Sequence, residues 1–339
     1  MKKRILSFML ALTVITCIFA GCSGSSEPAA QQDAAPAESP SGDSAGSSDA
    51  SGKTYKVAFL PGDMANESQA YSAKQFEKFG PEYGFEVTIL DGQGDAQVQA
   101  QTVSNCIAQG MDALFINPND VNGIAPSLKE AKDAGLIVAL FSSDLPTEFA
   151  DFRHIFVGVN DNMAGETAGK AFMDHFPDGA TIVEVGGQAG HDAQIKRHDG
   201  FDAAIKDSNI EVLGSQSAST WSTSDAMAIT EDFIVKYGDQ IQGVFCHWDN
   251  GATGVIGALK AAGMDDVYLI AVDGCRAGFD QVKSSEQSVT IMQNFSTMSK
   301  KTLEVVKAAL EGQDYEAINY VPLDAVSIDN IDQFEYPEW

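Results

Sequence analysis

The chain has 339 residues, of which 44% are hydrophobic, and its formal net charge at pH 7 is −27. An acidic surface of this kind repels phosphate backbones, so nucleic acid is a poor partner for it. After the first 53 residues about 285 remain, which exceeds the usual size of a single hydrophobic core and predicts two lobes.

The chain starts with an export signal. Residues 2–4 are basic, residues 5–20 are apolar, and two small residues follow, as a signal peptidase requires. The apolar stretch is short for a membrane span. Cys22 after small residues resembles a bacterial lipobox, with Phe19 where Leu is commoner. That resemblance implies cleavage after residue 21 and a diacylglyceryl group on Cys22, which would anchor the protein to the outer face of the cell membrane.

An ordinary cleaved signal peptide followed by a chance Cys remains the alternative. The next segment favours the anchor, because residues 23–53 consist almost entirely of Ser, Gly, Ala, Pro, Gln, Asp and Glu. Such a composition cannot bury enough apolar surface to fold. We therefore expect residues 1–21 to be a lipoprotein signal peptide and residues 22–53 to be a disordered tether.

The rest of the chain alternates between strand and helix patterns. Short apolar runs predict strands at residues 55–60, 85–90, 113–116, 137–141, 155–159, 181–185, 210–214, 243–246, 268–272 and 289–292. Between most of them, apolar residues recur at helical spacing, as at positions 70, 73, 76 and 79. Alternation of this kind predicts βαβ units, parallel sheets and an α/β fold.

The pattern breaks near Asn160, where a new helix is expected after the fifth strand, because Asn and Asp are good N-cap residues. We expect two doubly wound parallel-sheet lobes joined by hinge strands near Asn160, near Asn294 and at residues 322–327. The N-terminal lobe would comprise residues 54–160 plus 294–322, and the C-terminal lobe residues 161–293 plus 323–339.

Three cysteines remain after the signal peptide and the lipidated residue, and none forms a CxxC pair. Cys106 and Cys246 lie in apolar patterns and are expected to be buried thiols. A disulfide between Cys246 and Cys275 stays open, since its geometry cannot be deduced from sequence.

Polar side chains follow nearly every predicted strand. In α/β sheets ligands bind at the carboxyl ends of the strands. Amides, carboxylates and hydroxyls suit a neutral polyhydroxyl ligand, and an indole can cover its C–H face. For any single residue, capping of the following helix is the alternative. The runs at the strand ends include residues 61–69, 117–120, 142–144, 186–192, 247–250, 273–274 and 293–294.

From residue 56 to residue 329 the chain resembles the ribose/galactose-type periplasmic sugar-binding proteins that serve ABC importers. The resemblance rests on FINPND at 115–120, NDNMAG at 160–165, RHDGF at 197–201, IAVDG at 270–274, and Gln293. It implies the type I periplasmic binding protein fold. The ligand-binding residues implied by it, or expected from the strand-end loops, are Asn66, Gln69, Asn117, Ser142, Ser143, Asp192, Arg197, Trp221, Trp248, Asp273 and Gln293.

The chain departs from the ribose-type pattern at three places. Ser142-Ser143 replace an Asp-Arg pair, Ser68-Gln69 replace two aromatic residues, and Trp248 stands where an Asn is found. These differences put ribose itself in doubt and leave another pentose, a hexose, a cyclitol or a ribose-like signal molecule open. For Trp221 and Trp248, packing in the core is the alternative to ligand contact.

No catalytic or metal-binding motif is evident. The chain lacks HExxH, GxSxG, CxxC and a calcium loop, and residues 165–171 fit a helix interior better than a phosphate loop. His191 and His247 could reach the cleft, but two His without a third ligand make a poor metal site. We therefore expect a protein that is not an enzyme and binds no cofactor or metal.

The resulting prediction is a monomeric, lipid-anchored, extracytoplasmic solute-binding protein that delivers a sugar or similar polyol to an ABC permease. A sensory protein of the same fold, presenting its ligand to a receptor, is the alternative. A transcription repressor of the related fold would need a helix-turn-helix before the first strand, where this chain has its tether. A secreted hydrolase would need a catalytic constellation, and none is visible.

Overall fold

The computed structural model describes residues 53–339. The predictions for the signal peptide, Cys22 and residues 23–52 of the tether lie outside this range. Within it, no helix is long and apolar enough to cross a lipid bilayer.

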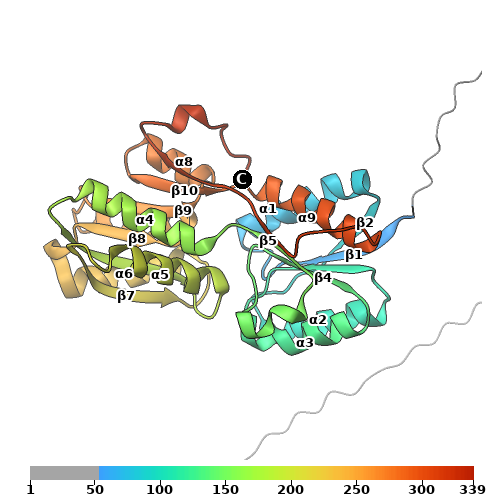
Figure 1. The fold of residues 1–339 in the computed structure, drawn as a ribbon. Helices are drawn as coiled ribbons and strands as arrows, with labels where there is room; N and C mark the ends of the chain where they lie inside the picture. The colour runs from blue at the N-terminus through green and yellow to red at the C-terminus, as the bar shows by residue number, and fades with distance from the viewer. Residues whose placement is uncertain (1–52) are drawn as a thin grey trace, which may run out of the picture. The chain divides into compact units, whose positions relative to one another are not determined.

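The first sheet contains six parallel strands with helices on both faces (Figure 1). Its order is β11 (Ile318–Tyr320), β5 (Ile155–Gly158), β4 (Ile137–Phe141), β3 (Ala113–Ile116), β1 (Tyr55–Leu60) and β2 (Phe85–Ile89). One face packs on α1 (Glu67–Phe79) and α9 (Phe295–Leu310), and the other on α2 (Ala96–Ala108) and α3 (Val121–Asp133).

The second sheet repeats this order with an antiparallel edge strand. It contains β12 (Leu323–Ser327), β10 (Val289–Gln293), β9 (Tyr268–Asp273), β8 (Gly243–Cys246), β6 (Ala180–Gln188) and β7 (Ile210–Ala218). Its faces pack on α4 (Asp161–His175) with α5 (Asp192–Ile205), and on α6 (Thr223–Tyr237) with α7 (Asp249–Ala261). Helix α8 (Arg276–Lys283) joins β9 to β10.

The expected fold class is confirmed, with two differences in detail. Strands β6 and β7 run three and four residues beyond the predicted ends, because they continue to pair through two register shifts. Strand β11 is absent from the predicted strands, whereas β12 lies within the hinge segment 322–327. They are short, three and five residues, and are held by pairing with β5 and β10, which no local pattern reveals.

The chain passes between the two sheets three times: from β5 to α4, from β10 to α9, and from β11 to β12. At the first two passages Asn160 and Asn294 act as helix N-caps, since their side chains accept hydrogen bonds from Met163 N and Thr297 N. Because all the strands of both sheets except β12 run parallel, the loops that follow their carboxyl ends gather at one edge of each sheet.

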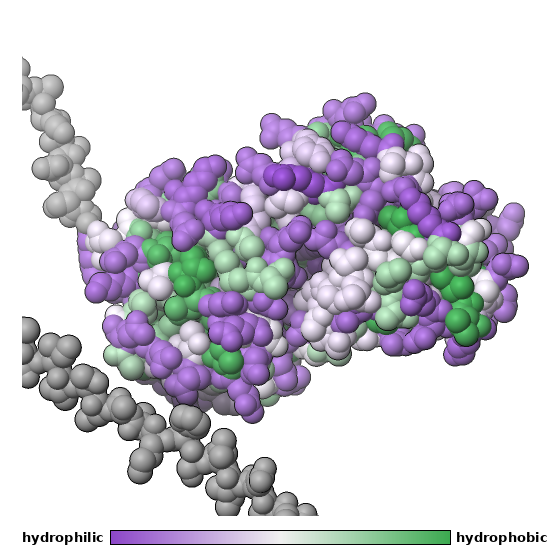
Figure 2. Space-filling view, turned by 180° about the vertical axis from the view of Figure 1, so that it is seen from behind, coloured by the Kyte–Doolittle hydropathy of each residue, from purple (hydrophilic) through white to green (hydrophobic). Residues whose placement is uncertain are grey.

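The hydrophobic residues divide between the faces of the two sheets. In the first sheet Phe59 and Phe115 face α1 and α9, whereas Leu114 and Ile116 face α2 and α3. All three cysteines of the described chain are buried and free, so the open possibility of a Cys246–Cys275 disulfide is not realised. The outer surface seen in Figure 2 is mainly hydrophilic with scattered apolar residues, in keeping with the acidic composition.

Helices α4 and α5 cross in close contact because two glycines lie between them. A Cβ at Gly165 would lie 2.0 Å from the carbonyl oxygen of Arg197, and a Cβ at Gly200 would lie 2.1 Å from that of Asn162. Neither backbone oxygen can move without shifting a helix, so the small residues set the distance between α4 and α5.

Gly165→Ala should therefore lower the free energy of unfolding by about 1–3 kcal/mol, since the new methyl group forces the two helices apart. Gly257→Ala in α7 is the matched control, because its nearest neighbour would be Met227 Cε at an ordinary 3.8 Å. This control should be neutral or stabilise by up to about 1 kcal/mol. Urea denaturation of both variants measures the difference, and equal stabilities would contradict the packing argument.

Candidate ligand-binding site

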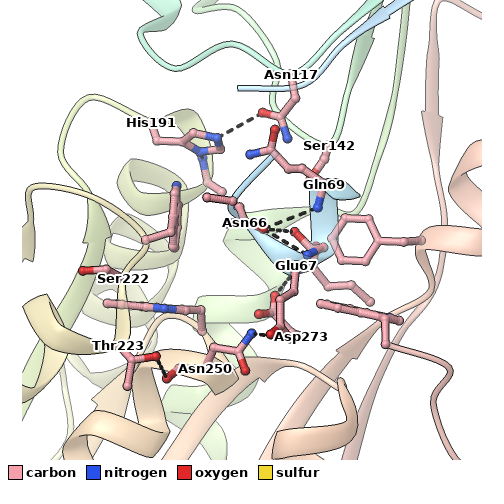
Figure 3. Close-up of a pocket in the computed structure, with 18 of the residues that line it drawn as sticks. Asn66, Glu67, Gln69, Asn117, Ser142, His191, Ser222, Thr223, Asn250 and Asp273 are labelled. Carbon is pink, nitrogen blue, oxygen red and sulfur yellow. Dashed lines mark hydrogen bonds between the residues drawn. The ribbon is translucent and has the colours of Figure 1, made fainter. Parts of the chain in front are cut away.

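A cavity of about 420 Å³ lies where the strand-end loops of the two sheets meet, within the size range of small-molecule sites. Figure 3 shows side chains from both lobes pointing into it. The predicted site residues that line the cavity are Asn66, Gln69, Asn117, Ser142, Arg197, Trp221, Trp248, Asp273 and Gln293.

Two predicted residues do not line the cavity. Ser143 is completely buried, and its hydroxyl has no hydrogen-bond partner among residues 53–339. Asp192, the first residue of α5, instead accepts hydrogen bonds from the backbone N–H of Asp144 at 3.0 Å and from Lys196 Nζ at 2.6 Å. Asp192 therefore joins the two lobes beside the cavity.

Arg197 carries its positive charge into the cavity although its side chain is almost completely buried. Its Nε donates to Asp161 Oδ1 at 2.8 Å, and Nη1 donates to the carbonyl oxygen of His247. A guanidinium has five N–H groups, so further donors remain for a ligand. The Asp161 carboxylate compensates for the burial of the charge.

Asn117 and His191 form a hydrogen bond between the lobes, with 3.1 Å between Asn117 Oδ1 and His191 Nε2 (Figure 3). Burial, followed by the charge of Arg197, lowers the pKa of His191 to about 3, so the ring is neutral at pH 7. Its Nδ1 accepts from Ala193 N, which places the proton on Nε2 as the donor to Asn117. The Asn117 amide nitrogen is left to donate to a ligand.

Two indole rings line the part of the cavity next to β6 and β8. Trp221 and Trp248 meet edge to face, with 5.5 Å between ring centroids. Each ring lies against a glycine: a Cβ at Gly187 would approach Trp221 to 2.1 Å, and a Cβ at Gly251 would approach Trp248 to 2.3 Å. Trp248 also belongs to the hydrophobic core, so packing and cavity lining coexist in this residue.

Asp273 is the last residue of β9 and is buried, and one of its oxygens accepts from Gln293 Nε2 at 2.9 Å. Burial and the neighbouring Asp249 carboxylate raise the pKa of Asp273 well above its ordinary range. Asp249 is itself held by Gly274 N, Cys275 N, Thr290 Oγ1 and Gln287 Nε2. Asp249 thus fixes the loop that presents Asp273.

Asn66 and Gln69 also have local structural roles. Asn66 caps α1, because its Oδ1 accepts from Ser68 N at 3.0 Å and from Gln69 N at 3.4 Å. The side-chain oxygen of Gln69 accepts from the backbone N–H groups of Gly62 and Asp63. The two alternatives considered for polar strand ends, capping and cavity lining, are therefore compatible here, because the amide nitrogens remain available to donate.

Beneath Arg197, a buried carboxylate holds the end of β8. Glu184 accepts from His247 Nε2 at 2.9 Å, from His198 Nδ1 at 2.8 Å and from Ser215 Oγ. These hydrogen bonds outweigh burial and lower the pKa of Glu184 below its ordinary range. The same contact raises the pKa of His198 to about 9. His247 is thereby fixed with its carbonyl oxygen toward Arg197.

A family model described as a periplasmic binding protein domain matches residues 57–314. The chain belongs to the periplasmic binding protein family. The ribose import binding protein of Bacillus subtilis is 28% identical, covering 80% of this chain and 87% of that protein. The fructose import binding protein of Bifidobacterium longum is 29% identical, with coverages of 81% and 85%.

Among solved structures, a galactofuranose binding protein is 25% identical to this periplasmic binding protein with a TM-score of 0.78. The alignment covers 82% of this chain and 96% of that chain. The resemblance inferred from the motifs is thus confirmed at the level of family and fold. These relatives are named as binding proteins, not enzymes.

Several residues that line the cavity of this periplasmic binding protein were not predicted. Thr223 and Asn250 extend a hydrogen-bonded rim that reaches Glu67 of the other lobe at 3.2 Å from Asn250 Nδ2 (Figure 3). For Asn250 the available signal was its place in the strand-end run 247–250, whereas Thr223 lies beyond the end of β7, at the start of α6. Phe295 and Trp339 also line the cavity. Phe295 directly follows the strand-end run 293–294, whereas no strand-end pattern indicates Trp339. Among residues 53–339, no group of three His, Cys, Asp or Glu side chains could hold a metal ion.

Asp273→Asn should stabilise the ligand-free protein at neutral pH. A carboxyl whose pKa is raised by folding binds its proton more tightly in the folded state, so the free energy of unfolding falls as pH rises through that pKa. The Asn side chain does not titrate, so the free energy of unfolding of this variant should not fall in the same way. At pH 8 it should exceed that of the wild type by at least about 1 kcal/mol, which corresponds to roughly one pKa unit. The advantage should vanish near pH 4.

Urea denaturation at several pH values measures this difference. Asp178→Asn is the control, because Asp178 is exposed in a turn and accepts no hydrogen bond from residues 53–339. Its stability should follow that of the wild type at each pH. An Asp273→Asn variant that is less stable than the wild type at pH 8 would show that the Asp273 carboxylate is well compensated.

Proposed function

We propose that this protein captures a sugar, or a similar polyol, in the cavity and delivers it to an ABC permease. The observation that carries the proposal is the composition of the cavity: a guanidinium, a buried carboxyl group and several amides converge on a space also lined by indole rings. Hydroxyl groups can both donate and accept hydrogen bonds, and the C–H faces of a sugar can pack on aromatic rings.

The cavity offers both hydrogen-bond donors and an acceptor to the hydroxyl groups of a ligand. Arg197 and the amide nitrogens of Asn66 and Asn117 would donate to ligand oxygens, and Asp273 would accept from ligand hydroxyls. Buried polar atoms without partners in the described chain support this assignment, namely Trp248 Nε1 and Gln293 Oε1. Such atoms are costly in a dry site, and a ligand that pairs with them would recover part of that cost.

Ligand capture is proposed to shift the arrangement of the two lobes. The moving bodies would be residues 54–160 plus 294–322 and residues 161–293 plus 323–339, connected by the three passages between the sheets. A ligand shifts a conformational equilibrium only through different contacts in the two states, and contacts with both lobes meet that requirement. Asn66 and Asn117 would supply one lobe's contacts, and Arg197 and Asp273 the other's.

The names of the relatives narrow the ligand class without fixing it. Ribose, fructose and galactofuranose are named for the relatives above, and all three are polyhydroxylated sugars. Ser142 and Ser143 in place of the Asp-Arg pair of ribose-type proteins argue for a ligand other than ribose. A sensory role for the protein would share this binding step and differ in the receiver of the liganded form.

A panel of sugars, alditols and cyclitols should raise the midpoint of thermal unfolding for at least one ligand class. At a hundredfold excess over Kd, binding adds about 2.7 kcal/mol to the free energy of unfolding. Asp273→Ala and Arg197→Ala should each weaken that ligand by at least about tenfold, or 1.4 kcal/mol, in isothermal titration calorimetry. Asp178→Ala is the surface control. No shift with any ligand would refute sugar capture, and unchanged affinity in both site variants would refute the site.

We also propose that Cys22 carries the lipid anchor and that the protein works at the outer face of the cell membrane. Cys22→Ser removes the thiol that would receive the diacylglyceryl group, so this variant should lose labelled palmitate and move from the detergent phase to the aqueous phase. Phase partitioning of protein from expressing cells measures this, with Cys106→Ser as control. Labelled palmitate retained by Cys22→Ser would contradict the anchor.

A further inference from the structure

The last residues of the sequence are held against α8 by hydrogen bonds to their backbone. Arg276, the first residue of α8, donates from Nε to the carbonyl oxygen of Pro337 at 3.2 Å and from Nη2 to that of Glu338. Its backbone N–H donates to the carbonyl oxygen of Trp339 at 2.6 Å. Tyr336 adds a hydrogen bond to Asp280. The segment 336–339 is therefore fixed to the C-terminal lobe.

The side chain of Trp339 points the other way and packs on helices of the N-terminal lobe. Its ring stacks on Tyr71 of α1, with centroids 5.9 Å apart and 19° between planes. Phe295 of α9 meets it edge to face at 5.1 Å. The Tyr71 hydroxyl donates to Glu338 at 3.2 Å. Tyr71 thus covers one face of the indole. The ring contacts the N-terminal lobe, whereas the backbone of the same segment is bonded to the C-terminal lobe.

Trp339 and Phe295 also line the ligand cavity, together with residues of α1 such as Ser68 and Gln69. The residues of α1 and its N-cap that line the cavity include no aromatic ring. Trp221 and Trp248 line the cavity from the other lobe. Together with Phe295 of α9, Trp339 therefore gives the N-terminal lobe's side of the cavity an aromatic surface that α1 does not provide.

We propose that Trp339 is a ligand-contacting residue whose indole packs on the C–H face of a ring-form sugar, and that Arg276 positions it. This inference rests on the proposed function and deepens it, since it names the ligand as cyclic. An acyclic alditol presents no fixed C–H face and would gain less from the indole. Arg276 does not line the cavity and acts through the backbone of residues 337–339.

The test is calorimetric titration of the purified full chain with the best ligand of the sugar panel and with an alditol of equal carbon number. Trp339→Ala should lower the affinity for the cyclic sugar by about tenfold. The affinity for the alditol should fall by less, because the alditol gains less from contact with the indole. Trp339→Phe should recover most of that affinity. Arg276→Ala should weaken the cyclic sugar by several-fold. Val235→Ala, an exposed residue of α6 outside the cavity, is the control.

Ligand-free thermal unfolding of each variant separates loss of contact from loss of packing. An unchanged affinity of Trp339→Ala would overturn the inference and leave sugar capture standing. An equal loss for cyclic sugar and alditol in both the Ala and the Phe variants, with a lowered unfolding midpoint, would also overturn it. Failure of the wild type to bind any sugar would refute the proposed function, and this inference with it.

Discussion

The cavity depends on the way in which one buried guanidinium is held. Arg197 of α5 bonds to Asp161, the first residue of α4, and to the carbonyl oxygen of His247 after β8, while Glu184 of β6 holds the His247 ring. Without the Asp161 carboxylate a buried positive charge would be costly, and without Gly165 and Gly200 the helices that carry the pair could not meet. The carboxylate that compensates Arg197 thus lies where the chain enters the second lobe.

Some buried polar atoms of the cavity have no hydrogen-bond partner within residues 53–339, and this has a consequence for the choice of ligand. Burial disfavours the Asp273 carboxylate, and Gln293 Oε1 and Trp248 Nε1 have no partner within residues 53–339. In the proposed site, a ligand with hydroxyls at the matching positions would pair these groups, whereas an analogue that lacks one hydroxyl would leave a buried polar atom unpaired. Sites of this kind discriminate more strongly against a missing hydroxyl than hydrophobic pockets do against a missing methylene.

Local sequence patterns predict most of the strands and much of the cavity, because the carboxyl ends of parallel strands meet at one edge whatever the tertiary detail. Asp273 and Asn117 follow from this rule. The strand-end pattern does not distinguish which of two adjacent residues faces the cavity. Both Ser142 and Ser143 were therefore predicted, but only Ser142 lines the cavity. The place of Trp339 at the cavity could not be predicted from local patterns, because it depends on contacts with Tyr71 and Arg276, which are distant in sequence.

Contacts between the lobes use the same loops that line the cavity. His191 engages only the oxygen of the Asn117 amide, and Asn250 reaches Glu67 next to the Asn66 cap. The His191 ring and the Asn117 amide are both neutral, and the Glu67 carboxylate accepts a hydrogen bond from Asn250. These two contacts between the lobes therefore leave no charge without a partner. A ligand that donates to or accepts from the remaining amide and carboxylate atoms adds to these contacts without displacing them. Binding and lobe approach would therefore reinforce each other through residues such as Asn117.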